Sequence, residues 1–183
     1  MKRLTTLFLD RCKFTGTIPD FLGKPTELGQ LTLGEKGLVS PIPESLGSLQ
    51  TLYYLSLNNL AMSIPIPSWI GNLKRLTFLN LGTSGYTGPI PDWIGDLQAL
   101  ETLVLIDNQL SGPVPSSFSR PQQLKTLLLF SNAGFAGELS VSLGLTATCN
   151  TTRTKLCSSS LNTQIMCRLN SCPMRIGSSS NCD

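Results

Sequence analysis

A 24-residue period runs through most of this chain and limits what it can fold into more than any other feature. The pattern starts at residues 4, 28, 52, 76, 100 and 124, and the first, fourth and sixth places of all six copies are leucine. Self-similarity at such a period indicates a solenoid, in which each repeat packs only against its neighbours. The sequence therefore predicts one long core of stacked leucines.

Each repeat divides into a strand half and a turn half. Its first eight residues alternate apolar and variable side chains, which predicts a β-strand with one buried face. Six such strands, one per repeat, are expected to stack in parallel and to be joined by long crossovers. A proline later in the repeat keeps the chain extended. After it we expect a single helical turn, capped by a side chain such as Asp20 or Asp92 and closed by a glycine such as Gly23 or Gly95.

The repeat reads L-x-x-L-x-L-x-x-N-x-L and continues with Gly-x-Ile-Pro, as in residues 88–91. This pattern resembles the leucine-rich repeat, and its second half resembles the plant subclass found in receptor-like kinases, receptor-like proteins and polygalacturonase inhibitors. The resemblance covers about residues 4–144. It implies a right-handed α/β-type solenoid that is mostly β, with a parallel sheet on the concave side and short helical turns on the convex side.

The ninth place of the repeat departs from the family pattern in several copies. Family members carry an asparagine there, which bonds the loop backbone of adjacent repeats. This sequence has Asn108 and Asn132 in the last two copies, but the earlier copies hold Cys12, Lys36, Leu60 and Ser84. Cysteine and serine are expected to substitute in part, whereas lysine and leucine are not.

The periodicity is lost near residue 145, so we divide the chain into a solenoid at residues 1–144 and a cap or tail at residues 145–183. The tail holds five of the six cysteines, namely Cys149, Cys157, Cys167, Cys172 and Cys182. Their density suggests disulfides and an oxidising compartment, although five thiols cannot all pair. Plant-type repeat domains commonly end in a cysteine-paired cap, which Cys149 and Cys157 fit loosely. Asn150 opens an N-glycosylation sequon.

Several classes of function are disfavoured by composition. The net charge is +3 and opposite charges balance through the repeats, so no basic stripe for nucleic acid is present. The sequence has no histidine, the commonest general base, and no C-x-x-C pair that would suggest zinc. We therefore expect neither an enzyme nor a bound cofactor or metal. The sequence contains no run of about 18 apolar residues, so it predicts no membrane span.

The variable third, fifth, seventh and eighth places of the repeats would supply the concave face. Aromatic neighbours, an apolar quartet on the last two strands and three polar residues are the candidate ligand contacts there: Tyr54, Asn58, Phe78, Asn80, Val104, Ile106, Asp107, Leu128 and Phe130. Apolar patches and aromatic anchors are typical of interaction sites. Alternatives stay open for both apolar features: simple packing between strands for the aromatic pair, and either cover by the tail or mere strand propensity for the quartet.

The leading hypothesis is an extracellular or cell-surface recognition module that binds a protein or peptide across the concave face. It resembles the ectodomain of a plant receptor in signalling or defence, which implies a protein or peptide ligand and a co-receptor as partners. The alternative is a secreted inhibitor of a cell-wall-degrading enzyme, like the polygalacturonase inhibitors. A third possibility is a fragment of a larger receptor with little function of its own.

Overall fold

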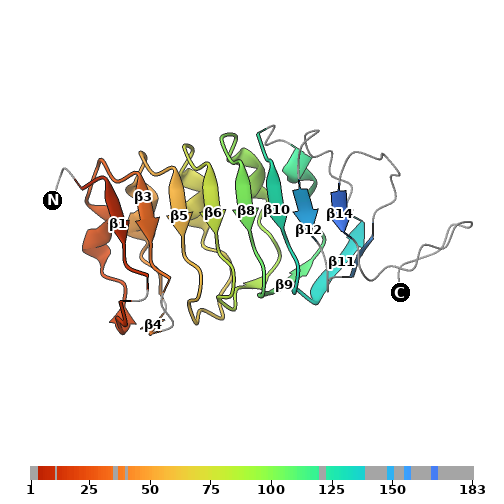
Figure 1. Cartoon of the computed structure of the whole chain (residues 1–183), viewed down its shortest axis with the longest axis horizontal. Coiled ribbons are helices and arrows are strands. Elements are labelled where there is room, and N and C mark those ends of the chain that lie inside the picture. Colours follow the sequence, from red (N-terminus) through yellow and green to blue (C-terminus); the bar gives the residue numbers. More distant parts are fainter. Residues whose placement is uncertain are drawn as a thin grey trace, which may run out of the picture.

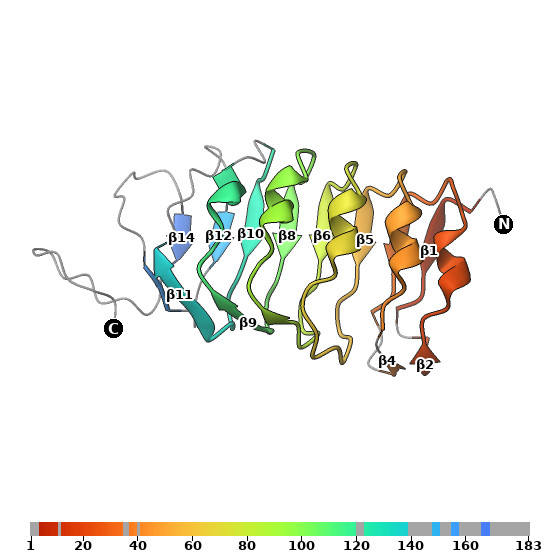
Figure 2. The same cartoon turned by 180° about the vertical axis from the view of Figure 1, so that it is seen from behind.

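The computed structural model describes residues 4–10, 12–34, 37–39, 41–119, 123–138, 148–150, 155–157 and 166–168. These residues form one elongated row of repeats, with a parallel sheet along one side and short helical turns along the other (Figures 1 and 2). Successive repeats lie side by side in the order of the sequence, as expected for a solenoid.

The main sheet has eight parallel strands in sequence order. They are β1 (Thr6–Phe8), β3 (Gln30–Thr32), β5 (Tyr54–Ser56), β6 (Phe78–Asn80), β8 (Thr102–Val104), β10 (Thr126–Leu128), β12 (Thr148–Asn150) and β14 (Met166–Arg168). The first six are the strands that the period predicts. The other two come from the cysteine-rich region and extend the same sheet. The sequence did not predict them, because the 24-residue period is lost there.

Narrow second sheets run along the flank of the row, and the sequence did not predict them. One contains β7 (Thr87–Gly88), β9 (Gln109–Gly112), β11 (Gly134–Glu138) and β13 (Lys155–Cys157), and the other pairs β2 (Gly16–Thr17) with β4 (Leu38–Val39). β7 and β9 end where a proline follows directly, because proline has no N–H to continue a ladder.

The predicted helical turns are present as 3-10 turns on the side opposite the main sheet (Figure 2). They are η1 (Asp20–Gly23), η2 (Glu44–Ser48), η3 (Ser68–Asn72), η4 (Asp92–Asp96) and η5 (Ser116–Ser119). One turn follows the proline of each of the first five repeats. The convex side is therefore built from single turns rather than from longer helices.

The predicted side-chain caps of these turns are wrong. Asp20 and Asp92 are the first residues inside η1 and η4, and the position before each is proline, with no side-chain capping bond. The turns close through backbone hydrogen bonds instead. In η4, for example, the carbonyl of Pro91 accepts the N–H of Ile94 at 3.2 Å. The fixed φ of proline already shapes the chain for this bond.

The glycines of the turns also have a different role from the predicted one. Gly95 lies inside η4 rather than after it, and a Cβ there would overlap the carbonyl oxygen of Ser117 in the next turn. A Cβ at Gly71 would lie 3.1 Å from the ring of Trp93. The glycines are needed because the turn of the following repeat packs directly on them.

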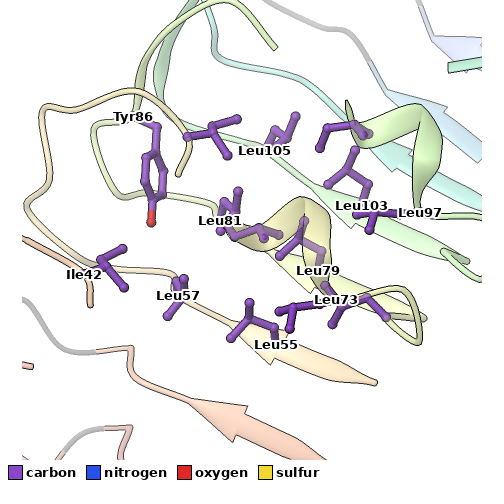
Figure 3. Packing of buried hydrophobic residues seen from close by; sticks show 14 of the residues in the cluster. Ile42, Leu55, Leu57, Leu73, Leu79, Leu81, Tyr86, Leu97, Leu103 and Leu105 are labelled. Carbon is purple, nitrogen blue, oxygen red and sulfur yellow. The ribbon is translucent and has the colours of Figure 1, made fainter. Parts of the chain in front are cut away.

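The core is a continuous stack of the leucines at the first, fourth and sixth places. From the second to the sixth repeat these leucines are at most 1% exposed, and Figure 3 shows Leu55, Leu79 and Leu103 side by side from neighbouring strands. Leu7 and Leu9 of the first repeat are only half-buried, and Phe8 beside them is 54% exposed. Burial of a ladder leucine thus requires a repeat on both sides.

The ninth-place residues behave largely as predicted. The buried Asn108 amide donates to the carbonyls of Leu81 and Leu105, and its oxygen accepts the N–H groups of Ser84 and Tyr86 at 3.2 and 3.0 Å. The Ser84 hydroxyl bonds the Leu57 carbonyl at 2.9 Å and so replaces part of this network one repeat earlier. Two other copies lack it. The prediction that cysteine substitutes in part is wrong, because Cys12 bonds only the nearby Asp10 carbonyl. Leu60, as predicted, does not replace the asparagine, and its side chain packs into the core. Lys36 lies outside the described residues.

Candidate binding surface

The face of the main sheet that is turned away from the 3-10 turns is called the concave face below. Strand residues 24 positions apart are Cα partners across β1, β3, β5, β6, β8 and β10. The third and fifth places of the repeats therefore form straight columns across the strands. This register places the predicted contact residues of the strands in two columns, one with Tyr54 and Phe78 and the other with Asn80, Val104 and Leu128.

The predicted aromatic neighbours are stacked. Tyr54 on β5 and Phe78 on β6 are Cα partners, and their rings are parallel within 2° with centroids 4.3 Å apart. Both side chains are half-buried, so each ring has one face or edge left for a ligand. The two interpretations of this pair are compatible, because the rings pack on each other and still contribute to the surface.

The apolar quartet lies at the other end of the concave face. Val104 on β8 and Leu128 on β10 are Cα partners, and Ile106 and Phe130 follow two residues later on the same two repeats. All four side chains are half-buried. The Cγ1 atom of Ile106 also leans over Gly82, 2.8 Å from the position a Cβ there would take. The quartet is thus a partly exposed apolar strip.

Two of the three predicted polar residues are held in place by hydrogen bonds. Asn58 accepts the hydroxyl of Ser56 at 2.6 Å, and Asn80 accepts the N–H of Gly82 at 3.0 Å. Asp107 is exposed at the rim, just past the end of β8. These contacts fix where the amide groups of Asn58 and Asn80 stand.

Sequence reasoning missed the backbone conformation at the rim. The eighth places of four successive repeats have left-handed φ, at Asn59 (56°), Thr83 (56°), Asp107 (51°) and Ser131 (59°). The N–H of Thr83 donates to the carbonyl of Ile106 in the next repeat at 2.8 Å, and Asp107 does the same to Phe130 at 3.2 Å. Asparagine and aspartate tolerate this conformation, but threonine and serine gave no signal for it.

Several predicted modification sites fall on strands of the cysteine-rich region. Cys149 and Cys167 are Cα partners on β12 and β14, at the same register position as Leu127. Cys157 pairs with Glu138, and Asn150 pairs with Leu128 and with Arg168. Cys172 and Cys182 lie outside the described residues, and Cys12 is an exposed free thiol.

Comparison with known proteins identifies the family of this solenoid. A sequence profile described as Leucine Rich Repeat matches residues 3–25 and 99–121, and plant receptor ectodomains share the fold of most of the chain. The chain is a plant-type leucine-rich repeat protein.

Three solved structures illustrate the similarity. The Arabidopsis receptor kinase HAESA, in complex with the peptide hormone IDA and the co-receptor SERK1, has a TM-score of 0.71 and 32% identity over 78% of this chain. A plant ice-binding protein has a TM-score of 0.65 and 30% identity over 69% of this chain. The BIR2 ectodomain from Arabidopsis thaliana has a TM-score of 0.58 and 28% identity over 69% of this chain.

The chain spans only part of the length of the proteins it matches. It spans 24% of the HAESA chain, 41% of the ice-binding protein and 67% of the BIR2 ectodomain. A comparison with curated protein sequences finds no significant match. Within the described part of the chain, no helix is long and apolar enough to cross a membrane.

Proposed function

We propose that this leucine-rich repeat protein is an extracellular recognition module that binds an extended peptide or a protein segment across its concave face. The observation that carries the proposal is the pair of partly exposed apolar features on that face, the stacked Tyr54 and Phe78 rings and the quartet on β8 and β10. A solved relative supports it, since the HAESA structure contains the peptide hormone IDA.

Binding would work by rigid presentation. The ladder leucines fix the strands, and the strands fix the side chains of the concave face, so a ligand would order little of the protein. An extended ligand crossing the strands would meet the aromatic pair and then the quartet. Aromatic residues in such positions are the usual hot spots of an interface.

The extracellular setting rests on the cysteine-rich region and the sequon. The Cα atoms of Cys149 and Cys167 lie on adjacent paired strands, and strand spacing of about 4.8 Å falls within the range for disulfides. A disulfide there and a glycan at Asn150 are part of this proposal. Peptide mapping of secreted protein without reduction tests both, and free thiols at Cys149 and Cys167 with an unmodified Asn150 would contradict the setting.

The experiment that tests binding is a selection from a displayed library of random 12-residue peptides, followed by affinity measurements on variants. Tyr54→Ala or Phe78→Ala is expected to weaken the selected peptides about tenfold, which corresponds to about 1.4 kcal/mol. Phe21→Ala is the matched control, because Phe21 is an exposed aromatic on η1, away from the concave face. Equal effects of all three substitutions would contradict the proposed site.

The receptor and inhibitor alternatives can be separated with the same protein. A receptor-like module is expected to bind short peptides on the concave face. An inhibitor of a cell-wall-degrading enzyme is instead expected to reduce polygalacturonase activity in a direct assay. Inhibition without peptide binding would favour the inhibitor, because the leucine-rich repeat fold alone does not choose between functions.

A further inference from the structure

Two oxygen atoms converge over a glycine on the concave face. Gly34 occupies the seventh place of the second repeat, between Asp10 and Asn58 in the same place of its neighbours. The position of a Gly34 Cβ would lie 2.7 Å from Oδ1 of Asp10 and 2.9 Å from Oδ1 of Asn58. A carboxylate oxygen and an amide oxygen therefore approach one point from opposite sides.

Buried hydroxyl groups hold both side chains in place, through Oδ2 of Asp10 and Oδ1 of Asn58. Thr32, only 5% exposed, donates to Oδ2 of Asp10 at 2.7 Å, and Ser56, only 4% exposed, donates to Oδ1 of Asn58 at 2.6 Å. The N–H of Gly34 adds a bond to Oδ1 of Asp10 at 3.1 Å. No other donor among the described residues reaches either oxygen.

Each of these oxygens keeps hydrogen-bonding capacity after those contacts. A carboxylate accepts about four hydrogen bonds and an amide oxygen about two, so at least one lone pair stays free on each side chain. Both groups are acceptors, and Asp10 is an exposed carboxylate. Two acceptors that face each other are complementary to a group that only donates.

We propose that Asp10 and Asn58 form a subsite for a cationic group of the ligand, the ammonium of a lysine or the guanidinium of an arginine. This inference rests on the proposed peptide-binding function and adds the chemistry of one contact. Charge-assisted hydrogen bonds to a carboxylate are stronger than neutral ones. The hydroxyls of Thr32 and Ser56 keep the acceptors in position before the ligand arrives.

The subsite and the apolar quartet together define a spacing in the ligand. Gly34 belongs to the second repeat, while the quartet belongs to the fifth and sixth, three to four strand spacings away. At about 4.8 Å per strand this is roughly 14 to 19 Å, and an extended peptide rises about 3.3 Å per residue. The basic residue is therefore expected about four to six residues from a bulky apolar residue.

The library selection described above tests this subsite when peptides are analysed by sequence and by a double-mutant cycle. Selected peptides are expected to carry lysine or arginine at that spacing. Asp10→Asn is expected to weaken such a peptide about tenfold, and the same peptide with norleucine in place of lysine is expected to lose this sensitivity. Asp92→Asn makes the same charge change on η4, on the opposite side, and is expected to have no effect.

Asn58→Asp provides a test in the opposite direction. A second carboxylate beside Gly34 is expected to tighten binding of the lysine peptide several-fold and to leave the norleucine peptide unchanged. If the Asn58 amide instead donated to Asp10, Asn58→Asp and Asp10→Asn would lower the melting temperature without changing relative peptide affinities. That result overturns the subsite.

The outcomes separate failure of the subsite from failure of the proposed function. Peptides that depend on Tyr54 or Phe78, but bind equally well with lysine or norleucine, would overturn the cationic subsite and leave peptide binding in place. Peptides that ignore every substitution on the concave face would overturn both.

Discussion

At the scale of single residues, Tyr86 stands out because it is fully buried and its hydroxyl has no hydrogen-bond partner among the described residues. Figure 3 shows its ring at the edge of the ladder leucines, with which it shares the hydrophobic core. An unpaired buried hydroxyl costs about 1–3 kcal/mol of desolvation. Tyr86→Phe removes that cost at the expense of a small void, so the free energy of unfolding is expected to rise by up to about 1 kcal/mol.

Urea denaturation of Tyr86→Phe measures this change. Tyr53→Phe is the matched control, because the Tyr53 hydroxyl is exposed and accepts a bond from the Gln30 amide, so its removal is expected to bring no gain. The Tyr86→Phe variant is also expected to change how stability depends on pH. Burial raises the pKa of Tyr86 in the folded protein, so stability is retained below about pH 10, where an unfolded tyrosine ionises, and falls as the pH rises further.

The Tyr86→Phe protein is therefore expected to lose less stability than the wild type above about pH 10. Melting temperatures of both proteins between pH 8 and pH 11, measured under conditions where unfolding is reversible, would show the difference. Parallel curves for the two proteins would mean that Tyr86 ionises as freely in the folded state as in the unfolded chain.

Asn108 is the second residue whose effect can be calculated from its contacts. Asn108→Ala would leave the buried N–H groups of Ser84 and Tyr86 without their acceptor, each at a cost of about 1–3 kcal/mol. We expect a loss of about 2–5 kcal/mol in the free energy of unfolding. Ser84→Ala should cost less, since that hydroxyl accepts only the N–H of Leu60. A loss equal to that of Ser84→Ala would contradict this account.

The sequence was informative about residues wherever a side chain repeats at a fixed place. The ladder leucines, the ninth-place asparagines and the Tyr54–Phe78 neighbours all follow from the period, because register in a parallel solenoid is set by repeat length. The subsite at Gly34 was not predictable in this way. It depends on one hydroxyl under each acceptor, Thr32 and Ser56, and serine or threonine in a strand carries no such signal.

At the scale of elements, the 3-10 turns pack more closely in some repeats than in others. The turn after Gly95 presents Ser117, whose Cβ lies 2.6 Å from the position of a Gly95 Cβ, while the turn after Gly71 presents Trp93 at 3.1 Å. Gly95→Ala is therefore expected to force two turns apart and to cost about 1–3 kcal/mol. Gly71→Ala is the matched comparison and is expected to cost clearly less, because an indole ring can shift.

Thermal melts of the two glycine variants test this prediction, and Gly95→Ala is expected to have the lower melting temperature. Equal melting temperatures would show that close approach of the turns does not set their stability. The comparison also explains why the sequence misled at these positions. A glycine three residues after an aspartate resembles the residue that ends a helix. Position 95 requires glycine for another reason, which is the close approach of Ser117 in the next repeat, 22 residues later. Local patterns cannot show contacts of that kind.

At the scale of the whole molecule, the strands of the first and the sixth repeats have different surroundings. β1 has a strand on one side only in the described sheet, and Leu7 within it and Leu9 just after it are half-buried. The strand of the sixth repeat, β10, is instead followed by β12 and β14, and Leu127 is completely buried. The leucine of β1 is therefore partly exposed, as expected for an end strand, whereas the leucine of β10 is not. This difference indicates that the cysteine-rich region covers the sixth repeat.

The sequence concealed this cover because its spacing is irregular. The step from Leu127 to its partner Cys149 is 22 residues and the step from Cys149 to Cys167 is 18, whereas every earlier step is 24. Cysteine also replaces leucine at the fourth place. A search for a fixed period ends where the period changes, even though the strands continue at the same spacing in space.

Hydrogen exchange on the whole chain tests this continuity. The backbone of β12 is paired on both sides, to β10 and to β14, so its amides are expected to exchange no faster than those of β1, which is paired on one side only. β5, inside the array, serves as the protected reference. Exchange of residues 148–150 at the rate of an unstructured peptide, with β5 still protected, would mean that the sheet ends at β10. In that case Leu127 would lie at an exposed edge like Leu7, and the last repeat would contribute less to the rigid surface on which the proposed binding depends.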